Sequence, residues 1–287
     1  MSRLAIPKTY KLFIGGKFPR SESGRTTEVT STTGEFVANV AKASRKDARD
    51  AVVAARAAVA GWSGATAYNR GQVLYRVAEM LEGRTEQFVT EIVQSTGVTA
   101  AVARTEVSAA VDCLVWHAGW TDKFAQVHGG ANPVAGPFFN LSVPEPTGVV
   151  ALIAPSEAGT SLLGLVASIA PALTMGNTVV VLASESTPCP AMSFAEVLAT
   201  SDVPSGVVNI LTGDSAEVAP WLASHADVNA IDLTGAARDL AIECERSAAE
   251  TLMRVVRPGR FGPTESSFDR IAAFVETKTV WHTKSLA

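Results

Sequence analysis

The sequence is poor in the residues from which metal and redox sites are usually built. Its 287 residues include only three cysteines (Cys113, Cys189 and Cys244) and four histidines (His117, His128, His225 and His282). The cysteines are scattered, the histidines lie far apart from one another, and no pair of cysteines or of histidines has the spacing of a zinc or redox motif, so we predict no metal site. Isolated cysteines of this kind are expected to be reduced thiols, which favours a cytoplasmic protein.

Charge is also scarce. Charged residues make up 18% of the chain and the formal net charge is −4. No basic cluster large enough to cover a phosphate backbone occurs, so nucleic acid is not an expected partner.

Long apolar segments are few, and none predicts a membrane span. Residues 1–17 lack the apolar core of an export signal. The one long uncharged stretch, residues 158–184, is interrupted by Pro171 and by the turn signal Gly176–Asn177. This pattern predicts a buried helix, a turn and a buried strand, because lipid tolerates no exposed turn. We therefore expect no membrane association.

Recognisable catalytic and phosphate-binding motifs are missing too. The three-glycine dinucleotide fingerprint, the phosphate-binding loop that ends in Lys-Ser or Lys-Thr, and the paired-histidine zinc motif are all absent. Cys244 stands between Glu243 and Glu245, and these carboxylates would raise the pKa of its thiol, the opposite of what a nucleophile needs. From these motifs we predict no catalytic residue.

What the sequence does contain is a regular alternation of strands and helices. Hydrophobic residues make up 47% of the chain, enough for a large core. Short apolar runs at 149–154, 178–183, 207–211 and 228–233 are each followed by a helical segment, at 160–173, 191–199, 215–224 and 237–249. This order predicts a doubly wound α/β fold, a Rossmann-like parallel sheet covered by helices on both faces. Such sheets bind ligands at the carboxyl ends of their strands, at the topological switch point.

The flanking segments are predicted from their spacing and turn residues. Before the alternation we expect a hairpin that starts at 10–17, helices at 44–61, 69–96 and 101–124, and a strand at 138–143. Ser44 and Asp47 form a capping pair at the start of the first of these helices. At the end of the chain we expect a helix at 268–274 and a strand at 275–281.

Several of these segments resemble the aldehyde dehydrogenase superfamily. The resemblance is carried by Glu145–Val150 (Glu-Pro-Thr-Gly-Val-Val), Gly176–Val180 (Gly-Asn-Thr-Val-Val), Ser184–Pro188 (Ser-Glu-Ser-Thr-Pro), Val203–Asn209 (Val-Pro-Ser-Gly-Val-Val-Asn) and Leu233–Gly235 (Leu-Thr-Gly), which keep the order and spacing of the family. The resemblance implies a coenzyme domain of the aldehyde dehydrogenase type with a small β oligomerisation element.

The resemblance also implies how the chain divides. Residues 1–126 and 144–260 correspond to the coenzyme-type domain, and residues 127–143 and 268–287 to the oligomerisation element. Phe274–Val280 resembles the C-terminal strand of the family, yet only about thirty residues separate Thr251–Val256, the best candidate for the next strand of the family, from the end of the sequence. We therefore expect the catalytic domain to be absent, as if deleted internally. In this the chain resembles the degenerate second module of some tandem aldehyde dehydrogenases.

By resemblance, the coenzyme contacts would fall on the residues that follow the strands: Glu185, Thr212, Gly213, Thr234 and Gly235. Several neighbouring positions depart from the family pattern. Ser156–Glu157 stand where the family has Trp-Asn, whose asparagine stabilises an oxyanion, and Leu182–Ala183 replace its Lys-Pro. Asp214 and Glu217 would bring negative charge to the place of a pyrophosphate, and Ala236 replaces the serine of its Thr-Gly-Ser motif. No coenzyme is therefore expected, although NAD stays possible.

Three functional hypotheses follow from this pattern. The first is a catalytically inactive subunit that assembles with a full-length aldehyde dehydrogenase, or with itself, through Phe138, Phe139, Leu141, Val143, Phe274, Val275, Val280 and Trp281. An apolar patch would then lie where the catalytic domain normally packs. The second is an NAD(P)-binding oxidoreductase or NAD sensor. The third is a stand-alone homodimer that binds an unrelated small ligand.

Overall fold

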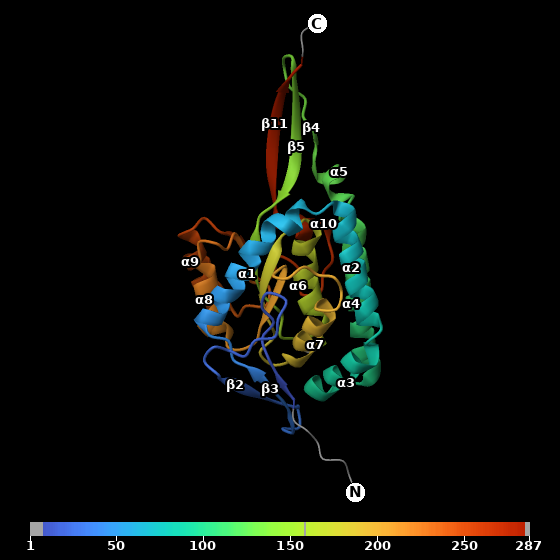
Figure 1. Cartoon of the computed structure of the whole chain (residues 1–287), viewed down its shortest axis with the longest axis vertical. Coiled ribbons are helices and arrows are strands. Elements are labelled where there is room, and N and C mark those ends of the chain that lie inside the picture. Colours follow the sequence, from blue (N-terminus) through green and yellow to red (C-terminus); the bar gives the residue numbers. More distant parts are fainter. Residues whose placement is uncertain (1–7, 158, 285–287) are drawn as a thin grey trace.

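A five-stranded parallel sheet lies at the centre of the molecule (Figure 1). The computed structural model describes residues 8–157 and 159–284. Parts of the predicted segments 1–126, 158–184 and 268–287, namely residues 1–7, 158 and 285–287, lie outside the described residues. The strands run in the order β10-β9-β6-β7-β8, with the bounds β6 Val149–Ile153, β7 Thr178–Leu182, β8 Val208–Leu211, β9 Ala230–Asp232 and β10 Arg254–Val256. The predicted doubly wound α/β fold is confirmed.

Helices cover both faces of this sheet because its strands are apolar on both sides. Along β6, Val150 and Leu152 point into the core that holds α2, α3, α4, α6 and α7, whereas Val149, Ala151 and Ile153 point into the core beneath α1, α8 and α9. The bounds are α1 Arg45–Gly64, α2 Ala67–Glu82, α3 Thr85–Thr96, α4 Ala100–Trp120, α6 Leu163–Thr174, α7 Cys189–Leu198, α8 Ser215–Ala223 and α9 Arg238–Ala249.

The helix predicted over 69–96 is wrong as a single element. The chain leaves the helix at Gly83 and Arg84, so α2 ends at Glu82 and α3 begins at Thr85. The apolar positions Leu81 and Phe88 lie seven residues apart, which is two helical turns, so the periodicity continues across the break and conceals it. The helix predicted over 101–124 is present as α4, which ends at Trp120, and the short helix α5, Phe124–His128, follows it.

The capping pair predicted at the start of α1 is confirmed. The Ser44 hydroxyl accepts the Asp47 N–H, and the Asp47 carboxylate accepts the Ser44 N–H at 2.8 Å. The same carboxylate accepts the Ser21 hydroxyl at 2.8 Å. The cap therefore also fixes the loop that enters the helix.

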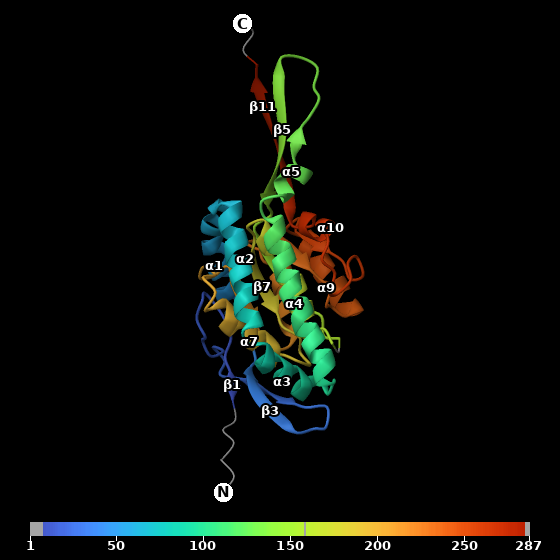
Figure 2. The ribbon, with the colours of Figure 1, turned by 90° about the vertical axis from the view of Figure 1, so that its right-hand side faces the viewer.

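Two smaller sheets flank the body. At one end, β1 (Thr9–Tyr10), β2 (Thr26–Thr30) and β3 (Phe36–Ala41) form a sheet in the order β1-β3-β2. At the other end, β4 (Gly130–Ala131), β5 (Phe138–Pro146) and β11 (Val275–Thr283) form an antiparallel sheet that projects from the body, as Figures 1 and 2 show. We call this projecting sheet the arm.

The tail that leads to the arm packs against the body. Only residues 257–274 lie between β10 and β11, and they include the short helix α10, Phe268–Ala272. The Arg270 side chain is fully buried, donates to the carbonyls of Gly262 and Glu265, and lies 3.6 Å from the buried Asp232 carboxylate. The tail is therefore joined to the central sheet through a buried ion pair.

No helix in the described part of the chain has both the length and the apolar character needed to cross a membrane. The helix, turn and strand predicted over 158–184 are present as α6, the turn at Gly176 and β7.

Candidate functional site

The first candidate region is the topological switch point, between the carboxyl ends of β6 and β9. Gly235 follows β9, and its N–H donates to the Ile153 carbonyl at 3.1 Å. A Cβ at this position would lie 2.3 Å from the Ala154 carbonyl oxygen, so the fold itself requires a glycine. The Thr234 hydroxyl donates to the Asp232 carboxylate at 2.5 Å and is therefore engaged at the end of its own strand.

The second candidate region is the N-terminus of α8. The Glu185 carboxylate accepts the Ser215 N–H at 2.7 Å, and the Asp214 side chain accepts the Ala216 N–H at 3.0 Å. Free N–H groups at a helix start are the usual donors to a phosphate. Here two of them bind carboxylates of the same chain.

The cations near this helix start are paired as well. Arg25 donates to Glu217 at 2.9 Å and lowers the pKa of that carboxyl. Lys42 lies 3.6 Å from Asp214 and 3.7 Å from Glu217. Asp214 and Glu217, which the sequence indicated only as charges that would repel a pyrophosphate, thus act as a helix cap and as an ion-pair partner.

A cavity beside this helix start brings together part of the predicted site. Glu185, Gly213, Asp214 and Lys42 line it, and its volume is 220 Å³. Ligand pockets usually measure about 300 Å³ or more. Thr234 and Gly235 do not line this cavity. The predicted coenzyme residues are therefore distributed over two places.

The remaining predicted positions hold the fold together. The Thr212 hydroxyl donates to the Ala41 carbonyl at 2.5 Å, which joins β8 to the end of β3. Gly213 has a φ of 136°, a conformation that favours glycine. Leu182 is buried in the core beneath α1 and α8, so its side chain offers nothing to a ligand. Ser156 and Glu157, where the family stabilises an oxyanion, are exposed after β6.

None of the three thiols has the environment of a nucleophile. Burial, and secondly Glu243, raises the pKa of Cys244 to about 11, which confirms the predicted direction with burial as the larger cause. Burial, and then Glu91, raises the pKa of Cys189 to about 12, and burial raises that of Cys113. Burial also lowers the pKa of His117 to about 4, so this histidine is neutral near pH 7. Within residues 8–157 and 159–284, no group of three potential ligands is placed to hold a metal ion.

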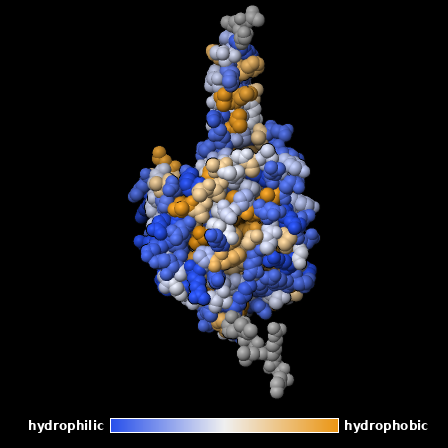
Figure 3. Space-filling model, in the orientation of Figure 1, coloured by the Kyte–Doolittle hydropathy of each residue, from blue (hydrophilic) through white to orange (hydrophobic). Residues whose placement is uncertain are grey.

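The third candidate region is the arm. Phe139, Leu141 and Val143 alternate along β5, so they share one face, and their exposed fractions are 57%, 41% and 43%. Val280 lies directly opposite Leu141 on β11 and extends the same face. Figure 3 shows hydrophobic residues gathered on the projecting arm. We call Phe139, Leu141, Val143 and Val280 the apolar face of the arm.

The other predicted contact residues lie elsewhere. Trp281 pairs with Asn140, which places it on the opposite face, where it packs edge-on against Phe138 with ring centroids 5.9 Å apart. Phe274 and Val275 are 0% and 4% exposed, because they pack where the arm enters the body. These two side chains therefore offer no surface to a partner.

Two buried groups were not predicted. Glu106 on α4 accepts the Leu162 N–H at 2.7 Å and the Leu163 N–H at 3.3 Å, so it caps α6 from inside the protein. The buried pair of Asp232 and Arg270 was also missed. No short sequence pattern indicates either of them. The Asp214 cap does have such a pattern, because an aspartate followed three residues later by a glutamate, here Glu217, is typical of a helix start.

Comparison with known proteins agrees with this architecture. The sequence model of the aldehyde dehydrogenase family matches residues 18–256. Cytosolic 10-formyltetrahydrofolate dehydrogenase of Mus musculus is 34% identical over 243 residues, which cover 82% of this chain and 26% of that protein. Aldehyde dehydrogenase, cytosolic 1 of Elephantulus edwardii is 34% identical over 250 residues, 85% of this chain and 49% of that protein. The chain thus spans half or less of the length of these curated relatives.

Solved structures give the same result. A betaine aldehyde dehydrogenase of Staphylococcus aureus in complex with NAD+ superposes with a TM-score of 0.81 and 25% identity, over 86% of this chain and 49% of that one. PnpE of Pseudomonas sp. WBC-3 superposes with a TM-score of 0.79 and 30% identity, over 86% and 50%. With the family match extending over most of its length, this chain belongs to the aldehyde dehydrogenase family.

Proposed function

We propose that this chain is a non-catalytic aldehyde dehydrogenase subunit that assembles through its arm. The observation that carries the proposal is the apolar face of the arm, where Phe139, Leu141 and Val143 are exposed although they lie on a regular sheet built from two separate parts of the chain. Exposed apolar surface that is gathered in one place usually marks an interaction site.

The engaged coenzyme crevice supports the non-catalytic part of the proposal. The carboxylates of Glu185 and Asp214 occupy helix N–H groups that a pyrophosphate would need, and the cavity beside them is small. All three thiols are buried with raised pKa values, so none is ready to attack an aldehyde. The three buried free cysteines suit a reducing compartment, and we include the cytoplasm in the proposal.

The partner that we propose is a full-length aldehyde dehydrogenase subunit. Strand β5 lies within residues 18–256, the part of the chain that the family shares. A strand that is shared with full-length members would offer them part of a surface like their own. Assembly with a second copy of this chain is the other outcome to test.

The test is co-purification of the tagged chain with a full-length aldehyde dehydrogenase of the same source, expressed together. We expect capture of the enzyme by the wild type and loss of capture by Leu141→Glu/Val143→Glu, which places two charges on the apolar face. The matched control is Val53→Glu/Val102→Glu, on exposed positions of α1 and α4. Equal capture by the arm variant and the control would count against the arm as the docking surface.

The NAD(P)-binding alternative has one observation in its favour. Structural neighbours hold NAD+ on the same fold, among them an aldehyde dehydrogenase of Bacillus cereus with a TM-score of 0.80. Calorimetric titration of the purified chain with NAD+ separates the two proposals. Binding in the micromolar range would favour a coenzyme-binding protein, and oxidation of any aldehyde by the chain alone would refute the non-catalytic proposal.

A further inference from the structure

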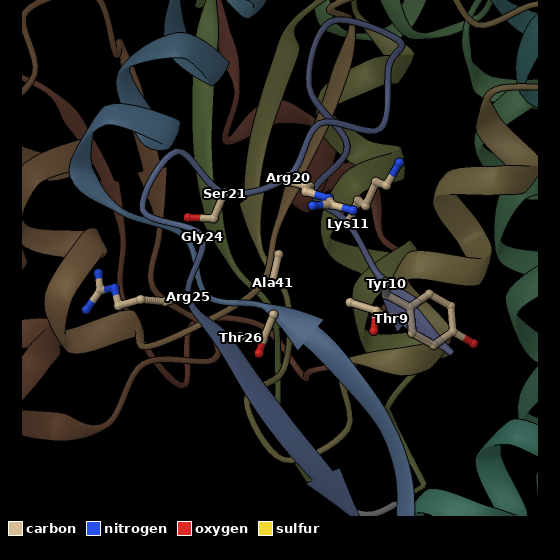
Figure 4. A pocket seen from close by; sticks show the side chains of 9 residues that line it. All are labelled: Thr9, Tyr10, Lys11, Arg20, Ser21, Gly24, Arg25, Thr26 and Ala41. Atoms are coloured by element: carbon tan, nitrogen blue, oxygen red, sulfur yellow. The ribbon is translucent and has the colours of Figure 1, made fainter. Parts of the chain in front are cut away.

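A second cavity lies at the end of the molecule that carries β1, β2 and β3, where its lining residues Thr26 and Ala41 adjoin Thr27 and Lys42 of the cavity beside Glu185. It has a volume of 330 Å³ and is bounded by the end of β1, the loop before β2 and the start of β2 (Figure 4). It shares no lining residue with the cavity beside Glu185. Its chemistry can therefore be considered separately from that of the coenzyme crevice.

The lining of this cavity carries positive charge and no carboxylate. Lys11, Arg20 and Arg25 contribute cations, and no aspartate or glutamate is among the lining residues. Arg25 is bound to Glu217, and Figure 4 shows its side chain directed away from Lys11 and Arg20. Lys11 and Arg20 form no ion pair within the part of the chain that the structure describes.

Two acidic groups beside the lining residue Ser21 are already engaged. Asp47 accepts the Ser21 hydroxyl and the Glu22 N–H while it caps α1, and Glu22 pairs with Lys46. Lys11 and Arg20 are exposed residues that line one cavity without a counter-charge among its lining residues, so an anion bound there would be attracted to both. The hydroxyls of Thr9 and Thr26 on the same lining add neutral donors.

We propose that this cavity binds a phosphate monoester. Lys11 and Arg20 together neutralise a charge of about −1.5 to −2, which is that of a phosphate monoester near pH 7. The planar guanidinium of Arg20 can hold two phosphate oxygens, and the ammonium of Lys11 can approach a third as a point charge. The volume of 330 Å³ is at the lower end of the range for ligand pockets, roughly 300 to 1,000 Å³, which suits a small phosphorylated metabolite.

The test is a titration of the full chain with inorganic phosphate and, separately, with AMP, at constant ionic strength, followed by the backbone amide signals of Lys11, Gly24 and Thr26. We expect saturable shifts at these amides with both probes. Tighter binding of AMP would identify a nucleotide as the better ligand, whereas equal binding would show that the phosphate group alone is recognised.

Variants distinguish this cavity from general attraction of anions. Lys11→Gln/Arg20→Gln should raise the dissociation constant about tenfold or more, and Arg20→Lys, which keeps the charge but loses the planar donor pair, should raise it less. The control Arg238→Gln/Arg246→Gln removes the same charge from α9 and should change it by less than about twofold, as expected for distant exposed charges. Unsaturable shifts, or a double variant that binds as the wild type does, would overturn the proposal.

Discussion

The buried ion pair between Arg270 and Asp232 should be the most sensitive link between the tail and the central sheet. Both side chains are buried, at 0% and 1% exposed, and their charged atoms lie 3.6 Å apart. In Arg270→Met, the Asp232 carboxylate would remain buried opposite an apolar side chain. Removal of one partner from a buried pair costs about 3–5 kcal/mol.

Urea unfolding, followed by circular dichroism, measures this cost. With a slope of about 3 kcal/mol per molar, a loss of 3–5 kcal/mol lowers the midpoint by about 1–2 M. The double variant Asp232→Asn/Arg270→Met should recover part of the loss, because it removes the unpaired charge and keeps an acceptor for the Thr234 hydroxyl. Lys278→Met is the control, since its ion pair with Glu145 is exposed and contributes about 0–1 kcal/mol. An Arg270→Met midpoint equal to that of the control would refute the reasoning.

Three further predictions concern buried and capping groups. The pKa of His117 is about 4 in the fold and 6.5 when unfolded, so the unfolded chain binds the proton first as the pH falls. The contribution of neutral His117 to the free energy of unfolding is therefore fully present above about pH 6.5 and should fall by about 3 kcal/mol towards pH 4. In urea unfolding measured over this pH range, His117→Gln should make the free energy of unfolding depend less on pH. The thiols of Cys113, Cys189 and Cys244 are buried, so a thiol reagent should label the native protein far more slowly than the urea-unfolded chain; rapid labelling of native protein would contradict their placement. Ser44→Ala removes the side-chain cap of α1 and should cost about 1 kcal/mol in thermal or urea unfolding, whereas no change would show that Asp47 holds the loop without it.

The central sheet could be predicted from the sequence because its strands are buried on both faces. Strands of this kind appear as short continuous apolar runs, and Thr178–Leu182 is a clear example. The break between α2 and α3 could not be predicted, since Leu81 and Phe88 keep the helical phase across it. A turn that leaves the helical spacing of the apolar residues unchanged cannot be detected from that spacing.

For the candidate site too, the sequence indicates which positions matter but not the contacts that their side chains make after folding. The positions of Glu185 and Gly213 followed from the order of motifs along the chain. What Glu185 binds depends on how α8 is placed against the end of β7, and its partner is the Ser215 N–H. Arg270 and Asp232 meet only after the tail has folded back, so no local pattern indicates the pair.

Assembly through the arm is tested most directly by the mass of the untagged chain in solution, alone and after co-expression with a full-length aldehyde dehydrogenase. We expect a mixed complex with the enzyme, which Leu141→Glu/Val143→Glu abolishes and Val53→Glu/Val102→Glu does not. A chain that remains at its monomer mass of 29.9 kDa in the presence of the enzyme would contradict assembly through the arm.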